Sequence, residues 1–121
     1  ILAEETAAGA FPILIHCFTA SADFAAAALN LGAYISLSGI VTFKNAHDLQ
    51  AVARTIPATR LLVETDAPFL APVPHRGLVC EPAFVADTAR FLAELRGESV
   101  DALHRQTGEN FYTLFAKAAR P

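Results

Sequence analysis

A short apolar run followed by a helix-like pattern occurs three times along the chain, and this alternation constrains the fold most. The apolar runs lie near residues 12–16, 33–37 and 60–65. The helix-like patterns follow at residues 21–31, 46–56 and 83–97. Strands that alternate with helices are typical of a parallel sheet in which each helix crosses back over the sheet. The sequence therefore predicts an α/β fold with three parallel strands joined by right-handed crossovers.

Local signals predict where the helices begin and end. Ser21 can cap the first helix and Gly32 can end it, and the second helix closes before Pro57. Residues 2–10 read as the end of a further helix, and two short helices are expected at 100–105 and 109–119. Three strands cannot close a barrel, so the open edges of such a sheet predict possible self-association with another copy.

The composition excludes several classes of protein. The length of 121 residues suits one domain. Hydrophobic residues make up 54% of the chain, which indicates strands and helices that are buried on both faces or are covered by a part of the protein outside these residues. No apolar run approaches the roughly 20 residues that cross a bilayer, so no membrane partner is expected. The net charge of −3 gives no overall attraction to nucleic acid. Two separated cysteines, Cys17 and Cys80, are predicted to be reduced, which fits the cytoplasm.

The third apolar run ends in two carboxylates, Glu64 and Asp66. Side chains two apart along a strand share one face, so these carboxylates should lie together. Burying two ionised carboxylates is costly unless a cation or hydrogen-bond donors compensate. The alternative is a strand that simply emerges into a polar loop.

Polar side chains also end the other strands. His16 follows the first strand, and Ser38 and Gly39 follow the second. Ligands bind at the carboxyl ends of parallel strands, so His16 and Asp66 should meet at one rim of the sheet. Imidazole and carboxylate hold Zn²⁺, Mn²⁺ or Mg²⁺ for hydrolysis, which makes a metal site the functional hypothesis. A histidine in an ordinary core or loop setting is the alternative for His16.

Cationic side chains are expected in the loops that overhang the same rim. Lys44 follows the second strand, and His75 and Arg76 follow the third. Beside a metal site they suit an anionic substrate, and Arg76 could grip a phosphate with two N–H groups. Ordinary solvated loop charge is the alternative for each of them.

Four motifs in order, HCFTA, YISLSGIVTFKNA, RLLVETDAPFLAPVPHRG and ENFYTLF, resemble the C-terminal part of the TatD family of metal-dependent hydrolases. The resemblance implies that residues 1–121 are the C-terminal portion of one (β/α)₈ TIM barrel domain, with its sixth to eighth strands. The resemblance also implies that the intact protein is a deoxyribonuclease that acts on DNA. It would use a divalent metal, Mg²⁺, Mn²⁺ or Zn²⁺, and would bind two ions. His16 and Asp66 match metal ligands, Asp66 also helps to activate the attacking water, and Glu64 resembles a supporting residue.

The chain departs from this family where further metal ligands are expected. Relatives carry an H-x-H pair on the first strand, a glutamate near the middle and a histidine on the fifth strand. The four histidines here form no H-x-H pair. We therefore expect residues 1–121 alone to be an incomplete, inactive fragment. Cleavage of an amide or ester at the same metal site is the alternative activity.

Overall fold

Three short strands form one parallel sheet in the computed structural model, which describes residues 1–120. They are β1 (Leu14–Ile15), β2 (Tyr34–Leu37) and β3 (Leu61–Val63), in that spatial order. Both pairings are parallel, with Ile15 opposite Ile35 and Leu37 opposite Val63. The predicted α/β class and the parallel sheet are confirmed.

The outer strands are shorter than predicted because the chain turns away from the sheet early. The backbone N–H of Glu64 still donates to the Leu37 carbonyl at 3.1 Å, but β3 itself ends at Val63. The Phe69 N–H then donates to the Asp66 carbonyl at 2.7 Å, which closes a tight turn. The two carboxylates therefore follow the strand instead of belonging to it.

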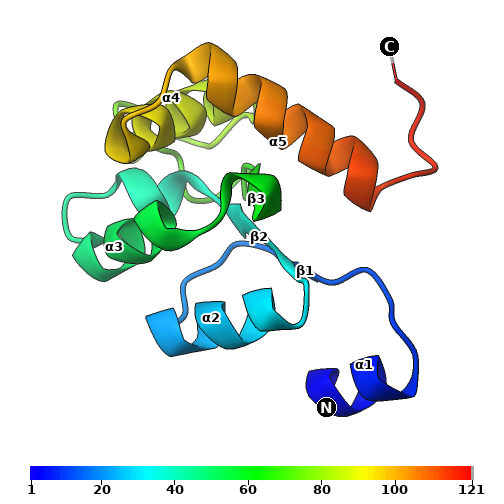
Figure 1. The fold of residues 1–121 in the computed structure, drawn as a ribbon. Helices are drawn as coiled ribbons and strands as arrows, with labels where there is room; N and C mark the ends of the chain where they lie inside the picture. The colour runs from blue at the N-terminus through cyan, green and yellow to red at the C-terminus, as the bar shows by residue number, and fades with distance from the viewer. Residues whose placement is uncertain (121) are drawn as a thin grey trace.

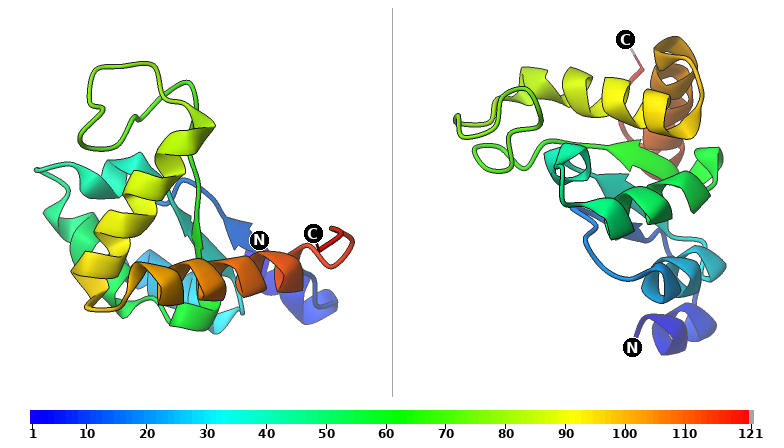
Figure 2. Two further views of the ribbon diagram at one scale, coloured as in Figure 1. Left: turned by 90° about the horizontal axis from the view of Figure 1, so that it is seen from above. Right: turned by 90° about the vertical axis from the view of Figure 1, so that its left-hand side faces the viewer.

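Five α-helices surround the sheet. They are α1 (Leu2–Ala8), α2 (Ala22–Asn30), α3 (His47–Thr55), α4 (Val85–Arg96) and α5 (Val100–Leu114). Short 3₁₀ helices lie at Gly39–Thr42, Ala58–Arg60 and Pro82–Phe84. In the views of Figures 1 and 2, α4 and α5 lie above the sheet, and α1 and α2 lie below it. None of these helices is long and apolar enough to cross a membrane.

The prediction of two short helices at 100–105 and 109–119 is wrong, because α5 runs through Gly108 without a break. A glycine inside a helix costs about 1 kcal/mol relative to alanine. Burial of Leu103, Thr107 and Asn110 on one face of α5 outweighs that cost. Asn110 adds two bonds from its side-chain amide, to the carbonyls of Ala58 and Leu61, both at 2.7 Å. Tertiary contacts therefore override the local helix propensity.

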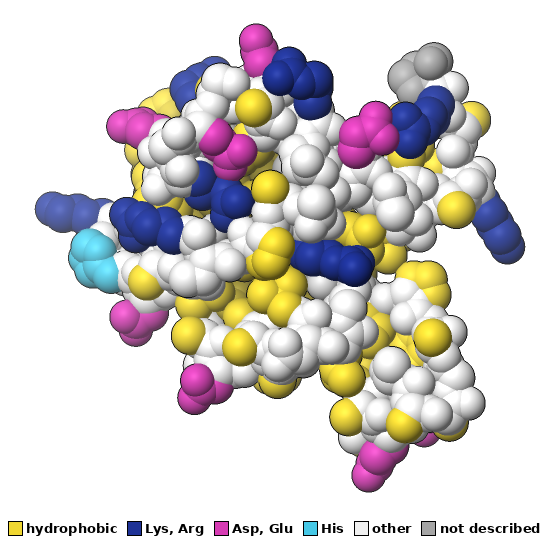
Figure 3. Space-filling model, in the orientation of Figure 1, with side chains coloured by type: hydrophobic (Ala, Val, Ile, Leu, Met, Phe, Trp, Pro, Cys, Tyr) yellow, Lys and Arg dark blue, Asp and Glu magenta, His cyan; other side chains and the backbone are white. Residues whose placement is uncertain are grey.

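The core is centred on β2, in which every side chain is buried. Ile35 and Leu37 pack there with Val41 and with Leu92 and Leu103 from α4 and α5. The edge strand β1 is only partly buried, and α1 buries no side chain. Apolar atoms are accordingly visible across the face drawn in Figure 3, below a group of Lys and Arg side chains. The sheet is thus well packed at its centre and open at the β1 edge.

The loops that follow β2 and β3 pack tightly against each other at the carboxyl ends of the strands. The Val73 N–H donates to the Thr42 hydroxyl at 2.9 Å. A Cβ placed on Gly39 would lie 2.2 Å from the Leu70 carbonyl oxygen, so only glycine allows this approach. The long loop from β3 to α4 projects beyond the strands in Figure 2. It is tied back on itself by the Cys80 N–H, which donates to the Pro68 carbonyl at 2.9 Å.

Candidate metal centre and adjoining loops

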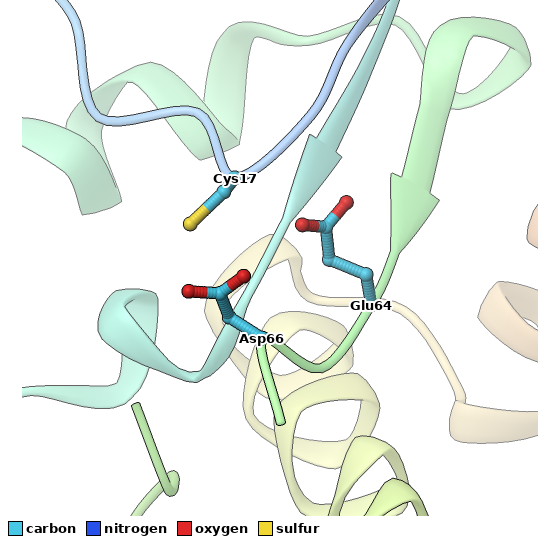
Figure 4. A group of neighbouring side chains, drawn as sticks. All are labelled: Cys17, Glu64 and Asp66. Carbon is cyan, nitrogen blue, oxygen red and sulfur yellow. The ribbon is translucent and has the colours of Figure 1, made fainter. Parts of the chain in front are cut away.

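Three potential metal-ligand side chains converge where β1 and β3 end. One ligand atom from each of Cys17, Glu64 and Asp66 lies within 4.8 Å of the others, and all three residues are partly buried. Figure 4 shows the thiol and both carboxylates pointing into the same space. The turn after β3 delivers Glu64 and Asp66, and the turn after β1 delivers Cys17. The sequence therefore correctly indicated carboxylates at this rim of the sheet.

His16 lies at the border of this cluster. Its Nδ1 is 3.8 Å from Oε1 of Glu64, and its side chain is 74% exposed, against 21% for Glu64. The imidazole thus reaches the cluster through Glu64 and is not among the three ligand atoms that lie together.

Cys17 was not among the site residues predicted from the sequence. Its φ of 46° is uncommon for a residue other than glycine, and it turns the chain sharply after His16. The Phe18 N–H then donates to the Ser36 carbonyl at 3.0 Å. As a result the Cys17 sulfur lies 3.4 Å from the Ser38 hydroxyl. The one available signal was position, because Cys17 directly follows a residue already assigned to the strand end.

The side chains present fit a divalent cation. Ligand atoms bind such an ion at 2.0–2.3 Å, so two on opposite sides lie at most about 4.6 Å apart. The three ligand atoms lie within 4.8 Å of one another, an upper bound about 0.2 Å above this maximum, so a shared ion requires them to be as close as that maximum or closer. Carboxylates suit Mg²⁺ and Mn²⁺, while thiolate and imidazole favour Zn²⁺. The donor set accommodates any of the three ions.

A second cysteine lies close to Asp66 from the far end of the long loop. Cys80 is buried, and burial raises the pKa of its thiol, with smaller contributions from the negative charges of Asp66 and Glu81. The thiol is therefore held in its neutral form. Both Cys17 and Cys80 are free thiols.

The predicted cationic residues Lys44 and Arg76 meet in one hollow of about 340 Å³. Phe43, Asn45 and Val73 complete its lining. The Arg76 guanidinium lies 3.6 Å from the centre of the Phe43 ring, which is a close cation–π contact. Stacking fixes the plane of the guanidinium and leaves its N–H groups directed outward along that plane. The two loops together thus present two positive charges, of which Arg76 is held in place by Phe43.

His75, also predicted to contact substrate, has partners within the protein. Its ring stacks on Phe84, with centres 3.8 Å apart and planes 6° apart. Its Nε2 lies 3.0 Å from Oδ2 of Asp87, and Arg90 bonds the other oxygen of that carboxylate at 2.5 Å. These contacts fasten the loop that carries Arg76 to α4. In this structure His75 anchors the neighbouring cation.

The parallel sheet thus carries carboxylates, an imidazole and a thiol at the carboxyl ends of its strands, which are donor types that bind divalent metals. The family profile described as "TatD related DNase" matches residues 1–116. The chain belongs to this family. The resemblance identified from the four sequence motifs is thereby confirmed.

Individual relatives agree with this assignment. The chain is 51% identical over 115 residues to the uncharacterized metal-dependent hydrolase YcfH of Escherichia coli K12. These aligned residues make up 95% of this chain and 43% of YcfH. It is 42% identical over 112 residues to the uncharacterized metal-dependent hydrolase YabD of Bacillus subtilis, covering 93% of the chain and 44% of the relative. The chain therefore spans less than half the length of the curated relatives it matches.

Solved structures show the same fold. The TatD homologue YjjV of Escherichia coli K12 superposes with a TM-score of 0.78 at 32% identity, over 84% of this chain and 39% of that one. A TatD family hydrolase of Entamoeba histolytica superposes with a TM-score of 0.81 at 19% identity, over 93% and 45% of the two chains. The second likeness supports the fold alone.

Proposed function

We propose that this chain is part of a divalent-metal-dependent nuclease that hydrolyses phosphodiester bonds of DNA. The observation that carries the proposal is the convergence of Glu64 and Asp66 with Cys17 at the carboxyl ends of the strands. The cations Lys44 and Arg76 in the adjoining loops supply the complement to a phosphate chain. The family profile, with its description as a DNase, gives independent support.

The proposal includes the architecture of the whole protein. We assign residues 1–121 to the C-terminal portion of one (β/α)₈ domain, with β1, β2 and β3 as its sixth, seventh and eighth strands. The open edge at β1 and the matching parts of the solved TatD structures support this assignment. Two ions in the intact protein and a cytoplasmic location, consistent with the two free thiols, complete the proposal.

The side chains predicted from the sequence have distinct roles in the proposed reaction. His16 and Asp66 would hold the metal, and Glu64 would support it from 3.8 Å behind the imidazole. A bound divalent ion lowers the pKa of water and stabilises negative charge on phosphoryl oxygens. Asp66 orients the attacking water and accepts its proton. Lys44 and Arg76 bind the phosphates that flank the scissile bond.

The direct test is Asp66→Asn in the intact protein. The amide cannot accept a proton or supply negative charge, so we expect a loss of about 10²-fold or more in cleavage of single-stranded DNA with Mg²⁺ or Mn²⁺. Asp23→Asn makes the same chemical change at an exposed position in the first turn of α2 and should keep full activity. An unimpaired Asp66→Asn protein would remove Asp66 from the mechanism.

A second assay separates nuclease from acyl hydrolase activity. A p-nitrophenyl ester offered under the same conditions should be a poor substrate, because Lys44 and Arg76 favour a phosphate anion. Hydrolysis of the ester without hydrolysis of DNA would move the function to amide or ester cleavage.

Residues 1–121 alone should be inactive. Stable ion sites need several ligands with supporting contacts, and loss of supporting groups alone costs 10- to 100-fold in affinity. We expect weak Mn²⁺ binding by calorimetry and no appreciable DNA cleavage. Robust cleavage by the purified 121-residue chain would contradict this expectation.

A further inference from the structure

Two neighbouring hollows share a wall formed by Phe43 and Arg76. The first is the cationic hollow of about 340 Å³ that contains Lys44. The second measures about 360 Å³ and is lined by residues 68–71 and 76–78 together with Phe43. The stacked guanidinium of Arg76 borders both hollows, and most of the other residues that line the second hollow are apolar.

An exposed aromatic ring lies in the second hollow. The Phe69 side chain is 67% exposed, and Leu78 beside it is 64% exposed. The Phe69 N–H donates to the Asp66 carbonyl at 2.7 Å, so the ring belongs to the turn that carries the candidate catalytic carboxylate. A flat apolar surface is thus held within one turn of the cluster and next to a fixed cation.

We propose that this second hollow binds a nucleobase, which stacks on Phe69 while the adjacent phosphate lies against Arg76 and Lys44. The inference rests on the proposed nuclease function and specifies which part of the substrate is recognised. A nucleotide combines a planar apolar group with an anion, and the two hollows offer the complementary pair. Every base has a π-face, so recognition by stacking tolerates any sequence.

This arrangement selects single-stranded nucleic acid. In a duplex both faces of each base are covered by neighbouring base pairs, and exposing one costs a few kcal/mol. Stacking of a free base on an aromatic side chain is worth about 1–3 kcal/mol. That gain does not offset the opening of a stable duplex, but it binds an already unpaired base. The substrate that fits the two hollows is therefore a single strand or a frayed end.

The test compares two fluorescein-labelled probes by anisotropy, an oligothymidylate and an abasic oligomer with the same number of phosphates. The intact protein is used in EDTA so that no cleavage occurs. We expect the wild-type protein to prefer oligothymidylate, and Phe69→Ala to weaken that binding about fivefold or more, to the level of the abasic probe. Phe69→Trp should retain the preference, because it keeps an aromatic face.

Matched variants separate stacking from charge. Arg76→Gln should weaken binding of both probes by similar factors, because both carry the same phosphates. Val79→Ala removes another exposed apolar side chain, 71% exposed and outside both hollows, and should change neither affinity. Unchanged circular dichroism in each variant confirms that the fold is retained.

Each alternative result has a definite meaning. Wild-type affinity for oligothymidylate in Phe69→Ala would overturn the stacking proposal. Equal wild-type affinity for the two probes, with the Arg76 dependence and DNA cleavage intact, would overturn stacking and leave the nuclease function standing. Absence of both DNA binding and metal-dependent cleavage in the intact protein would overturn the two proposals together.

Discussion

Gly39→Ala should destabilise the protein by forcing apart the loops that form the candidate site. The added Cβ would lie 2.2 Å from the Leu70 carbonyl oxygen and 2.9 Å from the Pro72 nitrogen. An ordinary C···O contact is about 3.3 Å, so the loop backbone must move by about 1 Å. Both neighbours are main-chain atoms, so no side-chain rotation can relieve the clash.

The expected cost follows from two opposing effects. Overpacking of this kind typically costs about 1–3 kcal/mol. Gly39 is not in the left-handed region, so alanine fits its backbone and recovers about 0.4–1 kcal/mol through the unfolded state. We expect a net loss of about 1–2 kcal/mol in the free energy of unfolding. The same displacement of the turn carrying Asp66 should lower DNA cleavage up to about 10²-fold, the effect known for a 1 Å misplacement.

Urea unfolding followed by circular dichroism measures the change. Gly108→Ala is the control, since nothing lies within 4 Å of its added Cβ and the site is inside α5. This control should raise stability by about 0.5–1 kcal/mol. If Gly39→Ala matched the wild-type protein in both urea midpoint and m-value, the loops would not be held in the close contact described.

Three further features of the structure lead to measurable outcomes. Asn110→Ala should lower the free energy of unfolding by about 1–3 kcal/mol in urea, because it leaves the buried Leu61 carbonyl and the partly buried Ala58 carbonyl without their donor, and Asn45→Ala at an exposed site should have little effect. Burial and nearby carboxylates raise the pKa of Cys80, so iodoacetamide at pH 8.5 should label it more slowly than Cys17 by mass spectrometry. The neutral Cys80 thiol stabilises the fold fully below the pKa that this thiol has in the unfolded chain. This contribution should be lost as the pH rises through the higher pKa of the folded protein. A free energy of unfolding that stays constant across this alkaline range would contradict the raised pKa of Cys80. Light scattering on residues 1–121 should show a mass that rises with concentration, through pairing at the open β1 edge, and a constant monomer mass would refute that pairing.

The fold was predictable where local pattern and tertiary structure agree. The alternation of apolar runs and helical patterns was enough for the parallel sheet, because each run had to be buried between crossover helices. The local pattern failed at α5, which was predicted as two short helices. Gly108 has a low helix propensity, but the buried face that includes Asn110 stabilises one continuous helix. The limits of β1 and β3 also escaped prediction, because turns within the loops end them and periodicity does not encode those turns.

The residues of the candidate site also differed in whether the sequence predicted them. Glu64 and Asp66 were predictable because one short stretch carries both. Cys17 was not, because it reaches them through an uncommon backbone angle and a pairing with residue 36 that lies far along the chain. The partners of His75 lie on α4, beyond any local pattern, so its anchoring role could be found only in three dimensions.

The contact between the loops after β2 and β3 also determines how the site can move. Val73 bonds to Thr42, and Arg76 stacks on Phe43, so each loop holds the other at two points. A loop held in this way cannot swing as an independent lid. Motion at the rim should be correlated across both loops, and a substitution in one that alters its position must be matched by a compensating change in the other. The loops of two consecutive βα units should therefore behave mechanically as a single part.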